Sequence, residues 1–386
     1  MSATIPCDVA IVGGGLAGGL IALALNKKHP DCTVRLIEAG RAIGGNHLWS
    51  FFASDIAPRD RWLTAPLISH GWPAYDVAFP AHARTLKSPY YSIESSRLDA
   101  VVRGALPQAA VMTGRKVAAV GANMVELADG ERIAAKGVID CRGAGDLSAL
   151  ECGWQKFYGR EIQLDDMHGI ERPVIMDATV DQLDGYRFVY ALPFGATRIF
   201  LEDTYYSDTP DLDAKALGAR IDAYAAARGW RAEAVLREEA GVLAVAMGGD
   251  FEAYWRAGGD KIAKAGARAG LFHPLTSYSL PDAVRTASLI ADARDLSGAG
   301  LHDLLHDFAR VTWRKRGFYR MLAKMLFKAA EPAERYRVLE RFYRLSPELI
   351  GRFYAGKSTV FDRMRTLSGK PPVPIGRAIK VIGGIK

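Results

Sequence analysis

The chain has 386 residues, 4 cysteines and a net charge of +7, and a length of this order predicts two or three structural units with a large buried core. Hydrophobic residues make up 49% and charged residues 24%, a globular composition that excludes a disordered chain. The cysteines form no CxxC pair and no apolar run is long enough to span a membrane, and because only three residues precede the first apolar stretch, no signal peptide is expected. We therefore expect a cytoplasmic protein without a disulfide framework, a metal site or a membrane-spanning helix.

The first forty residues have the pattern of a βαβ unit. A short buried strand is predicted at residues 8–12, a helix at 19–27 and a second strand at 33–37. Between the first strand and the helix stands Gly13-Gly14-Gly15-Leu16-Ala17-Gly18, a GxGxxG motif, and Glu38 closes the second strand.

This arrangement predicts a dinucleotide-binding site. Gly13 permits the tight turn, Gly15 lets a pyrophosphate approach the backbone, and Gly18 lets helix and strand pack closely. The free N–H groups of the helix N-terminus favour phosphate, and Glu38 suits the ribose hydroxyls. The alternative is a glycine-rich turn of an ordinary α/β protein.

Two further segments point from NAD to FAD. Residues 41–45 read RAIGG, an RxxGG that resembles the FAD-binding segment of flavoproteins with two dinucleotide-binding domains. Residues 140–145 resemble the strand-end turn at which such proteins pass the adenine side of FAD. Taken singly, each is equally compatible with a plain glycine turn.

The remaining elements alternate less regularly. We predict hairpins at 125–133, with Asp129-Gly130 at the turn, and at 186–206, with the turn at 193–195. The other predicted elements are strands at 137–141, 239–247 and 261–265, helices at 213–228 and 281–293, and a helical region over the last 85 residues that ends at the proline-rich stretch 371–374.

Three segments carry a more specific resemblance. Residues 266–279 read GARAGLFHPLTSYS, residues 45–51 read GNHLWSF, and residues 200–204 read FLEDT. With the N-terminal fingerprint, in this order and over nearly the whole chain, they resemble the bacterial lycopene β-cyclases. Two positions depart from the family pattern, because Asp203 replaces the second Glu of FLEET and Ser277 replaces the Gly of HPxTGY.

The resemblance implies an α/β fold with a discontinuous, Rossmann-like FAD-binding domain (1–50, 85–150 and 258–300). It further implies an antiparallel-sheet substrate domain (51–84 and 151–257) and a basic helical region (301–386). Its expected cofactor-binding residues are Gly13, Gly15, Gly18, Glu38, Gly44, Gly45, Asn46, Gly270, His273, Pro274, Thr276 and Ser277.

The activity implied is the net non-redox closure of the ψ-ends of lycopene into β-rings, through monocyclic γ-carotene to β-carotene. The resemblance implies that the FAD must be reduced, with NAD(P)H as the expected electron donor. The alternatives are a flavin-dependent monooxygenase or isoprenoid reductase on the same fold, and a non-catalytic flavin or lipid carrier.

Ring closure begins with protonation of an alkene, a very weak base, so the acid must be oriented and dry. Glu202 stands among aromatic and aliphatic residues and is the expected acid. Because side chains alternate along a strand, Asp203 should point to the opposite face and act in support. Glu239, in an EExG segment, is a candidate second carboxylate. The competing interpretation places these acids on solvated surfaces.

A positive charge on the substrate needs stabilising groups. The N-terminus of the helix after His273 is expected to favour a flavin anion, although His273 itself equally suits a backbone-capping role. Aromatic residues at positions 49, 51, 186, 188 and 190 are candidates for cation–π contact or for simple core packing.

The C-terminal region is strongly basic. From Arg310 onward there are 19 Lys and Arg against 5 Asp and Glu, and Arg316, Arg320, Lys324 and Lys328 recur four apart. This pattern predicts an amphipathic helix at a membrane surface. The resemblance implies that this surface is the inner face of the cell membrane, where lycopene and other carotenoid enzymes would be met. The alternative is a helix packed on the protein body with a solvated basic face. No nucleic-acid-binding motif accompanies the charge, so no nucleic acid is expected.

Overall fold

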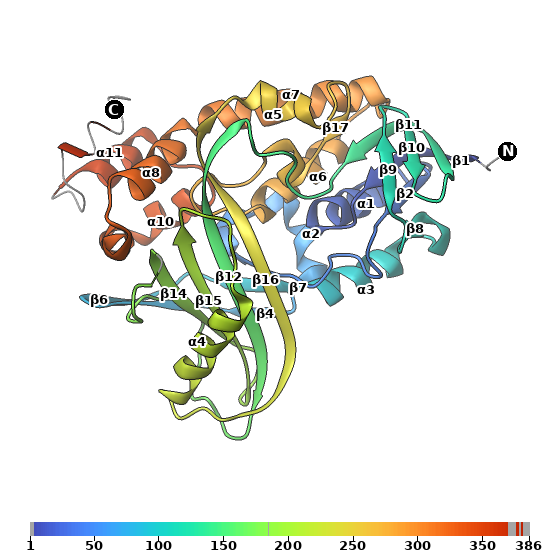
Figure 1. The fold of residues 1–386 in the computed structure, drawn as a ribbon. Helices are drawn as coiled ribbons and strands as arrows, with labels where there is room; N and C mark the ends of the chain where they lie inside the picture. Colours follow the sequence, from blue (N-terminus) through green and yellow to red (C-terminus); the bar gives the residue numbers. More distant parts are fainter. Residues whose placement is uncertain (1–3, 184, 370–375, 378–379, 381–386) are drawn as a thin grey trace.

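A computed structural model describes residues 4–183, 185–369, 376, 377 and 380. The described chain forms one mainly parallel sheet packed against helices, one long sheet that is antiparallel except where β13 and β5 pair in parallel, a small third sheet and a group of C-terminal helices (Figure 1). The mixed α/β architecture agrees with the predicted fold class.

The first sheet has the strand order β8-β2-β1-β11-β10-β9, with β17 paired to β11. Strands β1 (Thr4–Val12), β2 (Val34–Ile37), β8 (Val111–Met112), β11 (Arg132–Asp140) and β17 (Ala263–Lys264) pair in parallel. Strands β9 (Val117–Val120) and β10 (Met124–Leu127) extend it antiparallel. One face packs against α1 (Leu16–Lys28), α3 (Ser95–Ala105), α6 (Leu280–Ala291) and α7 (Gly298–Lys315). A parallel order of this kind leaves the carboxyl ends of β1 and β11 side by side, where a ligand cleft forms.

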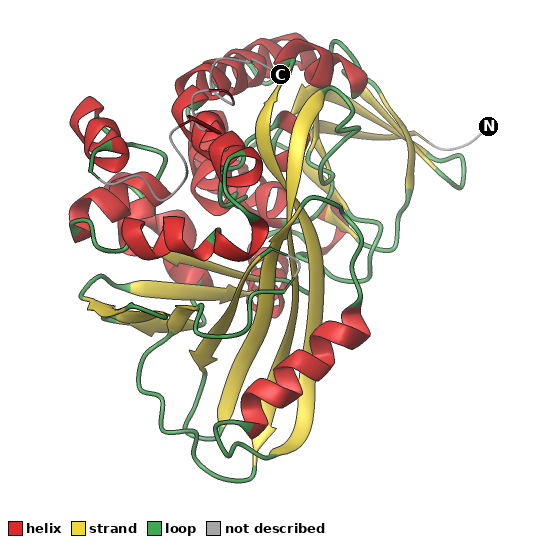
Figure 2. Ribbon diagram, turned by 60° about the vertical axis from the view of Figure 1, so that its left-hand side comes forward, coloured by secondary structure: helices red, strands yellow, loops and turns green. Residues whose placement is uncertain are grey.

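The second sheet has the order β16-β12-β15-β14-β13-β5-β6. Its strands are β5 (Tyr75–Phe79), β6 (His82–Leu86), β12 (Leu150–Leu164), β13 (Val174–Asp177), β14 (Tyr186–Pro193), β15 (Arg198–Ser207) and β16 (Ala232–Gly249). Helix α4 (Ala214–Ala226) covers one face with its own apolar cluster (Figure 2). The opposite face meets the third sheet and the C-terminal helices.

The third sheet, β3-β7-β4, joins the other two. Its strands are β3 (Leu48–Phe52), β4 (His70–Trp72) and β7 (Tyr90–Glu94). The short helices are α2 (Arg61–Thr64) and α5 (Phe251–Ala257), and the C-terminal group holds α8 (Gly317–Lys328), α9 (Tyr336–Phe342), α10 (Pro347–Tyr354) and α11 (Val360–Leu367). Over the described residues, no helix has the length and apolarity needed to cross a bilayer.

Several predicted elements need correction. The separate strand at 137–141 is the second half of β11, which runs unbroken because it pairs with β1 along its whole length. The strand at 239–247 is the C-terminal half of β16, which extends to Ala232 by pairing with the unpredicted β12. The strand at 261–265 shortens to two residues. The proline-rich stretch 371–374 lies outside the described residues, and the division into domains stays a prediction.

The predicted row of basic side chains on α8 is also not an exposed row. Arg316 is buried and binds Asp282 through both terminal nitrogens at 2.6 and 2.8 Å. Arg320 lies over the Trp313 ring at 4.0 Å. Lys328 is exposed, but α8 buries Phe327 and Leu326 against the second sheet. Helix α8 thus packs on the protein body, and its predicted contact with a membrane stays a prediction.

Candidate functional site

The GxGxxG segment forms a cradle at the end of β1. Gly13 has a φ of +101°, and a Cβ there would lie 2.8 Å from the Arg142 nitrogen. A Cβ on Gly18 would lie 2.0 Å from the Gly13 oxygen, whereas one on Gly15 would meet no described atom within 4 Å. Gly13 thus forms the turn, Gly15 leaves its backbone open to a ligand, and Gly18 allows the helix to pack closely on the strand, as the sequence predicts.

A cavity of about 440 Å³ opens above this cradle. Glu38 lies at its edge, with one carboxylate oxygen accepting the Gly14 N–H and the other the Gly40 N–H, both at 2.7 Å. Gly44 and Gly45 line the same cavity in left-handed conformations. Cys141 to Gly143 complete the wall from the end of β11, where the sequence placed the adenine side of FAD.

Asn46 does not line this cavity and instead lines a separate one with Glu94 and Glu161. Its side-chain amide donates to the backbone oxygen of Glu238. Asn46 therefore ties the loop before β3 to strand β16.

The segment 266–279 divides into a structural half and a ligand-facing half. Gly270 caps a short helical turn with a φ of +68°. Buried His273 accepts the Leu275 and Thr276 N–H groups at Nδ1, each at 3.3 Å. Burial and the nearby Arg316 charge lower the pKa of His273 to about 3, so its ring is neutral. Gly270, His273 and Pro274 line neither the cavity above the glycine cradle nor a second cavity beside the long sheet, and His273 caps the backbone.

Thr276 and Ser277 do face a cavity. Thr276 Oγ1 is buried without a hydrogen-bond partner among the described residues. Ser277 has a φ of +57°, and no other non-glycine residue among those described has a positive φ. This left-handed conformation explains why glycine suits the position. Its hydroxyl donates to the Ala244 oxygen at 2.7 Å, so the proton is committed to β16.

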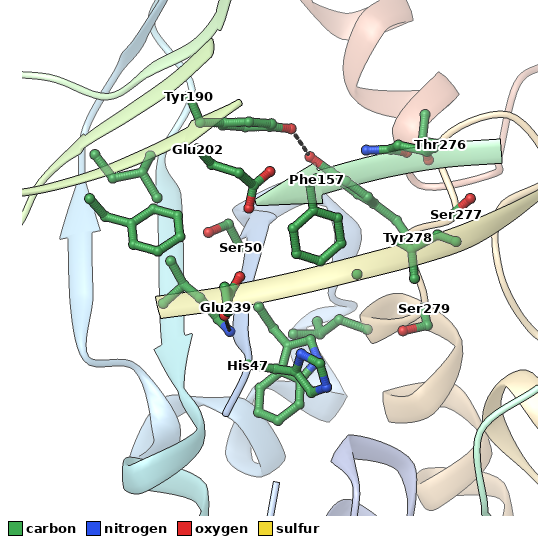
Figure 3. Close-up of a pocket in the computed structure, with 18 of the residues that line it drawn as sticks. His47, Ser50, Phe157, Tyr190, Glu202, Glu239, Thr276, Ser277, Tyr278 and Ser279 are labelled. Atoms are coloured by element: carbon green, nitrogen blue, oxygen red, sulfur yellow. Dashed lines mark hydrogen bonds between the residues drawn. The ribbon is translucent and has the colours of Figure 1, made fainter. Parts of the chain in front are cut away.

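That second cavity, of about 240 Å³, lies between the long antiparallel sheet and β3 (Figure 3). It shares His47, Trp49 and Ser279 with the cleft above the glycine cradle, so the two cavities adjoin. Ser279 precedes α6, whose N-terminus and its partial positive charge therefore point to the junction, as predicted.

The register of the long sheet places two glutamates in this cavity. Gly159 of β12 is paired with Glu202 of β15 on one side and with Glu239 of β16 on the other. Residues paired across strands point to the same face, so both carboxyl groups enter the cavity (Figure 3). A Cβ on Gly159 would lie 2.4 Å from the Phe200 ring, so the space between the acids is left to that ring.

Both carboxyl groups hold their protons more tightly than usual. Burial raises the pKa of Glu202, and the Asp203 charge raises it further, while Thr204 Oγ1 donates to Glu202 at 2.6 Å. Burial also raises the pKa of Glu239, followed by the Glu202 charge. The Leu48 N–H donates to Glu239 Oε2 at 2.8 Å. Both acids are poised to exchange protons near neutral pH.

Asp203 points away from the cavity, as the strand alternation predicts. It is fully buried toward α4 and accepts the Arg187 guanidinium at 2.5 Å (Nη2) and 3.1 Å (Nε). Of the predicted catalytic residues, Asp203 therefore lies outside the cavity, in an ion pair on the opposite side of the sheet, and its role in support of the chemistry stays a prediction.

Aromatic rings dominate the rest of the wall. Trp49 and Tyr190 line the cavity, whereas Phe51, Tyr186 and Phe188 belong to the buried core. Tyr190 and Tyr278 join their hydroxyls at 2.9 Å over Glu202 (Figure 3). The cavity is also lined by residues for which no role was predicted from the sequence: His47, Ser50, Gln155, Phe157 and Tyr278. The available sequence signal for this cavity is a glycine in each of two strands, Gly159 and Gly241. Each leaves room for an aromatic ring, because a Cβ there would lie 2.4 Å from Phe200 or Phe157, respectively.

Comparison with known proteins agrees with this geometry. The profile of the family described as lycopene cyclase protein matches residues 8–380. A lycopene beta-cyclase from Pantoea ananas is 46% identical over 97% of both chains, and one from Paracoccus sp. is 43% identical over 97% of both.

Similar solved structures share the fold at low identity. A geranylgeranyl bacteriochlorophyll reductase-like protein from Thermoplasma acidophilum superposes with a TM-score of 0.62 at 13% identity, covering 99% of this chain and 100% of the other. A p-nitrophenol 4-monooxygenase from Pseudomonas putida has a TM-score of 0.62 at 16% identity over 93% and 100%. Since the family profile spans nearly the whole sequence and its bacterial relatives align end to end, this chain belongs to the lycopene cyclase protein family.

Proposed function

We propose that this protein closes the ψ-ends of lycopene into β-rings without net oxidation or reduction, giving γ-carotene and then β-carotene. The observation that carries the proposal is the pair of glutamates that share one sheet face and line an aromatic cavity adjoining the glycine cradle. The full-length similarity to bacterial lycopene beta-cyclases supports it.

The residues present fit FAD as the cofactor. The open backbone at Gly15 and Gly143 leaves room for a pyrophosphate, and Thr276 Oγ1, without a partner among the described residues, offers a hydrogen bond in the wall of the second cavity. Glu38 would hold the ribose, with Gly13, Gly44 and Gly45 shaping the path. Bound and reduced, with NAD(P)H as the electron source, FAD would supply negative charge and π-density beside the substrate cation.

Glu202 supplies the proton in this proposal. Its carboxylic acid protonates C2 of the terminal double bond, and the C5=C6 π-bond then attacks the cation at C1. The surrounding rings of Tyr190, Phe200 and Trp49 exclude water and offer π-faces to the cation. Loss of a proton from C6 completes the β-ring.

We further propose that α11 docks the protein on the membrane that holds lycopene. Val360, Phe361, Met364 and Leu367 are exposed by 71%, 70%, 59% and 47%, and at helical spacing they form one apolar face. The opposite face is fixed to the protein, because Asp362 accepts the Arg352 guanidinium at 2.6 and 2.7 Å. The helix thus presents its apolar side outward, at the end of the molecule far from β1 (Figure 1).

The charge around this face favours anionic lipid. Arg363 and Arg365 flank the apolar residues on either side of the helix, and the region from Arg310 onward is strongly basic. Such a helix lies in the headgroup region with its cations on phosphate. This basic region, through α11 in place of α8, would hold the protein at the inner face of the cell membrane beside other carotenoid enzymes.

Phe361→Asp combined with Met364→Asp should weaken membrane binding at least about 10-fold, because each apolar side chain contributes roughly 1.5–3 kcal/mol when buried. Sedimentation with phosphatidylglycerol vesicles measures this, and phosphatidylcholine vesicles and high salt should also reduce binding. Leu236→Asp, at an exposed apolar position on β16, is the matched control. Equal sedimentation of the double variant and wild type would contradict docking through α11.

The activity itself is tested in bacteria that accumulate lycopene. Expression of the protein should convert the pigment into isomers of lycopene with one or two β-rings, identified by liquid chromatography and mass spectrometry. A product heavier by oxygen or hydrogen would instead indicate a monooxygenase or reductase. Unchanged lycopene beside FAD-loaded protein would indicate a carrier.

A further inference from the structure

Ring closure needs a base as well as an acid, and the cavity holds a second carboxylate in a different setting. Glu202 and Glu239 flank Gly159 on the same sheet face, two strand spacings apart, or roughly 9.5 Å between backbones. The two acids thus approach one bound end group from two sides, with the Phe200 ring between their strands.

Their surroundings differ in charge. Arg237 stands two residues before Glu239 on the same strand face, and its positive charge favours the carboxylate form of Glu239. The Leu48 N–H aimed at Glu239 Oε2 has the same effect. Glu202 has a hydroxyl donor and the negative Asp203 as its neighbours. Each acid thus has a donor to its carboxylate, and the pair shares a proton near neutral pH; ring closure starts from the form in which Glu202 carries that proton and Glu239 is charged.

Building on the proposed cyclase activity, we infer that Glu239 is the base that removes the C6 proton and thereby selects the β-ring. Glu202 gives its proton to C2 and becomes a carboxylate, and the C1–C6 bond forms with the positive charge moving to C5. Glu239 takes the proton from C6, and the C–H electron pair becomes the C5=C6 double bond. The proton then returns from Glu239 to Glu202, which restores both acids.

The C5 cation can lose a proton from more than one carbon, and the end group of the product shows which proton was removed. Loss of a proton from C4 gives an ε-ring, and loss from the methyl carbon on C5 gives an exocyclic double bond. A group that only supports the fold changes the amount of product, whereas the base determines which isomer forms.

The test compares wild type with Glu239→Gln, Glu239→Asp and Glu202→Gln, all loaded with reduced FAD and assayed on lycopene in D₂O. Glu239→Gln should lower kcat by about 100-fold or more with little change in KM. Its products should contain ε- or exocyclic end groups, and unreacted lycopene should gain deuterium at C2, because protonation by Glu202 then reverses. Glu202→Gln should show neither product nor deuterium. Glu239→Asp should retain partial activity with mixed end groups.

Glu238→Gln is the matched control, since Glu238 is the neighbouring residue on the opposite strand face and pairs with Arg160 at 3.1 Å. It should make β-rings at the wild-type rate. If folded Glu239→Gln makes only β-rings at the wild-type rate, or yields neither product nor deuterated lycopene, Glu239 is not the base. Failure of the wild type to convert lycopene would instead overturn the proposed function.

Discussion

Glu202→Gln should abolish cyclisation, with a loss of roughly 10³-fold in kcat, because glutamine cannot deliver a proton to an alkene. The substitution keeps the shape of the side chain and its bond from Thr204, so the fold and FAD content should persist. Pigment analysis and flavin absorbance on the same preparation separate lost chemistry from lost protein. A variant that still forms rings at a tenth of the wild-type rate would place the acid elsewhere.

The pH dependence follows from the same pair. Because burial raises the pKa of Glu202, its protonated form persists above the ordinary range for glutamic acid, and activity should fall as pH rises through that raised pKa. At low pH both acids are protonated and the base is lost, so the profile of kcat should be bell-shaped. Loss of the alkaline limb in an otherwise active enzyme would argue against a glutamic acid as the proton donor.

Asp203→Asn should unfold the protein more easily by about 3 kcal/mol, because it leaves the Arg187 guanidinium buried without its counter-charge. Burial raises the pKa of Asp203 and Arg187 opposes that rise, so the charged form of Asp203 depends on its buried partner. Thermal unfolding measures the loss, and below the new transition the variant should keep its kcat.

The double variant Asp203→Leu with Arg187→Met tests the same point without a buried charge. It should recover most of the stability lost in Asp203→Asn, since an apolar pair of similar volume avoids the unpaired guanidinium. If folded Asp203→Asn loses turnover as completely as Glu202→Gln, Asp203 takes part in the chemistry despite its position.

The sequence predicts those parts of the molecule whose signals are local. The GxGxxG turn, its strand and its helix lie within thirty residues, and the structure gives each glycine its expected geometry. The alternation along β15 correctly separates Glu202 from Asp203, because a strand has a period of two.

Features that depend on contacts between residues far apart in the sequence cannot be predicted from local patterns. Strand β12 contains charged residues and glycines, which weaken the alternating pattern by which a strand is predicted. It nevertheless lies between β15 and β16 and sets the register that aligns Glu202 with Glu239. Arg316 looks solvent-exposed in sequence, yet its partner Asp282 lies 34 residues earlier and buries it. The apolar face of α11 follows the same period as a core-facing helix, and only its placement shows that this face points outward.

The most direct test of the account is a single turnover of lycopene by the wild-type protein with reduced FAD in D₂O, followed by mass spectrometry and NMR of the product. Acid catalysis without net redox predicts one deuterium at C2 for each ring formed and no deuterium elsewhere, with a product isomeric to lycopene when water is the solvent. A product without deuterium at C2, or one that has gained oxygen or two hydrogens, would contradict protonation by Glu202 as the event that closes the ring.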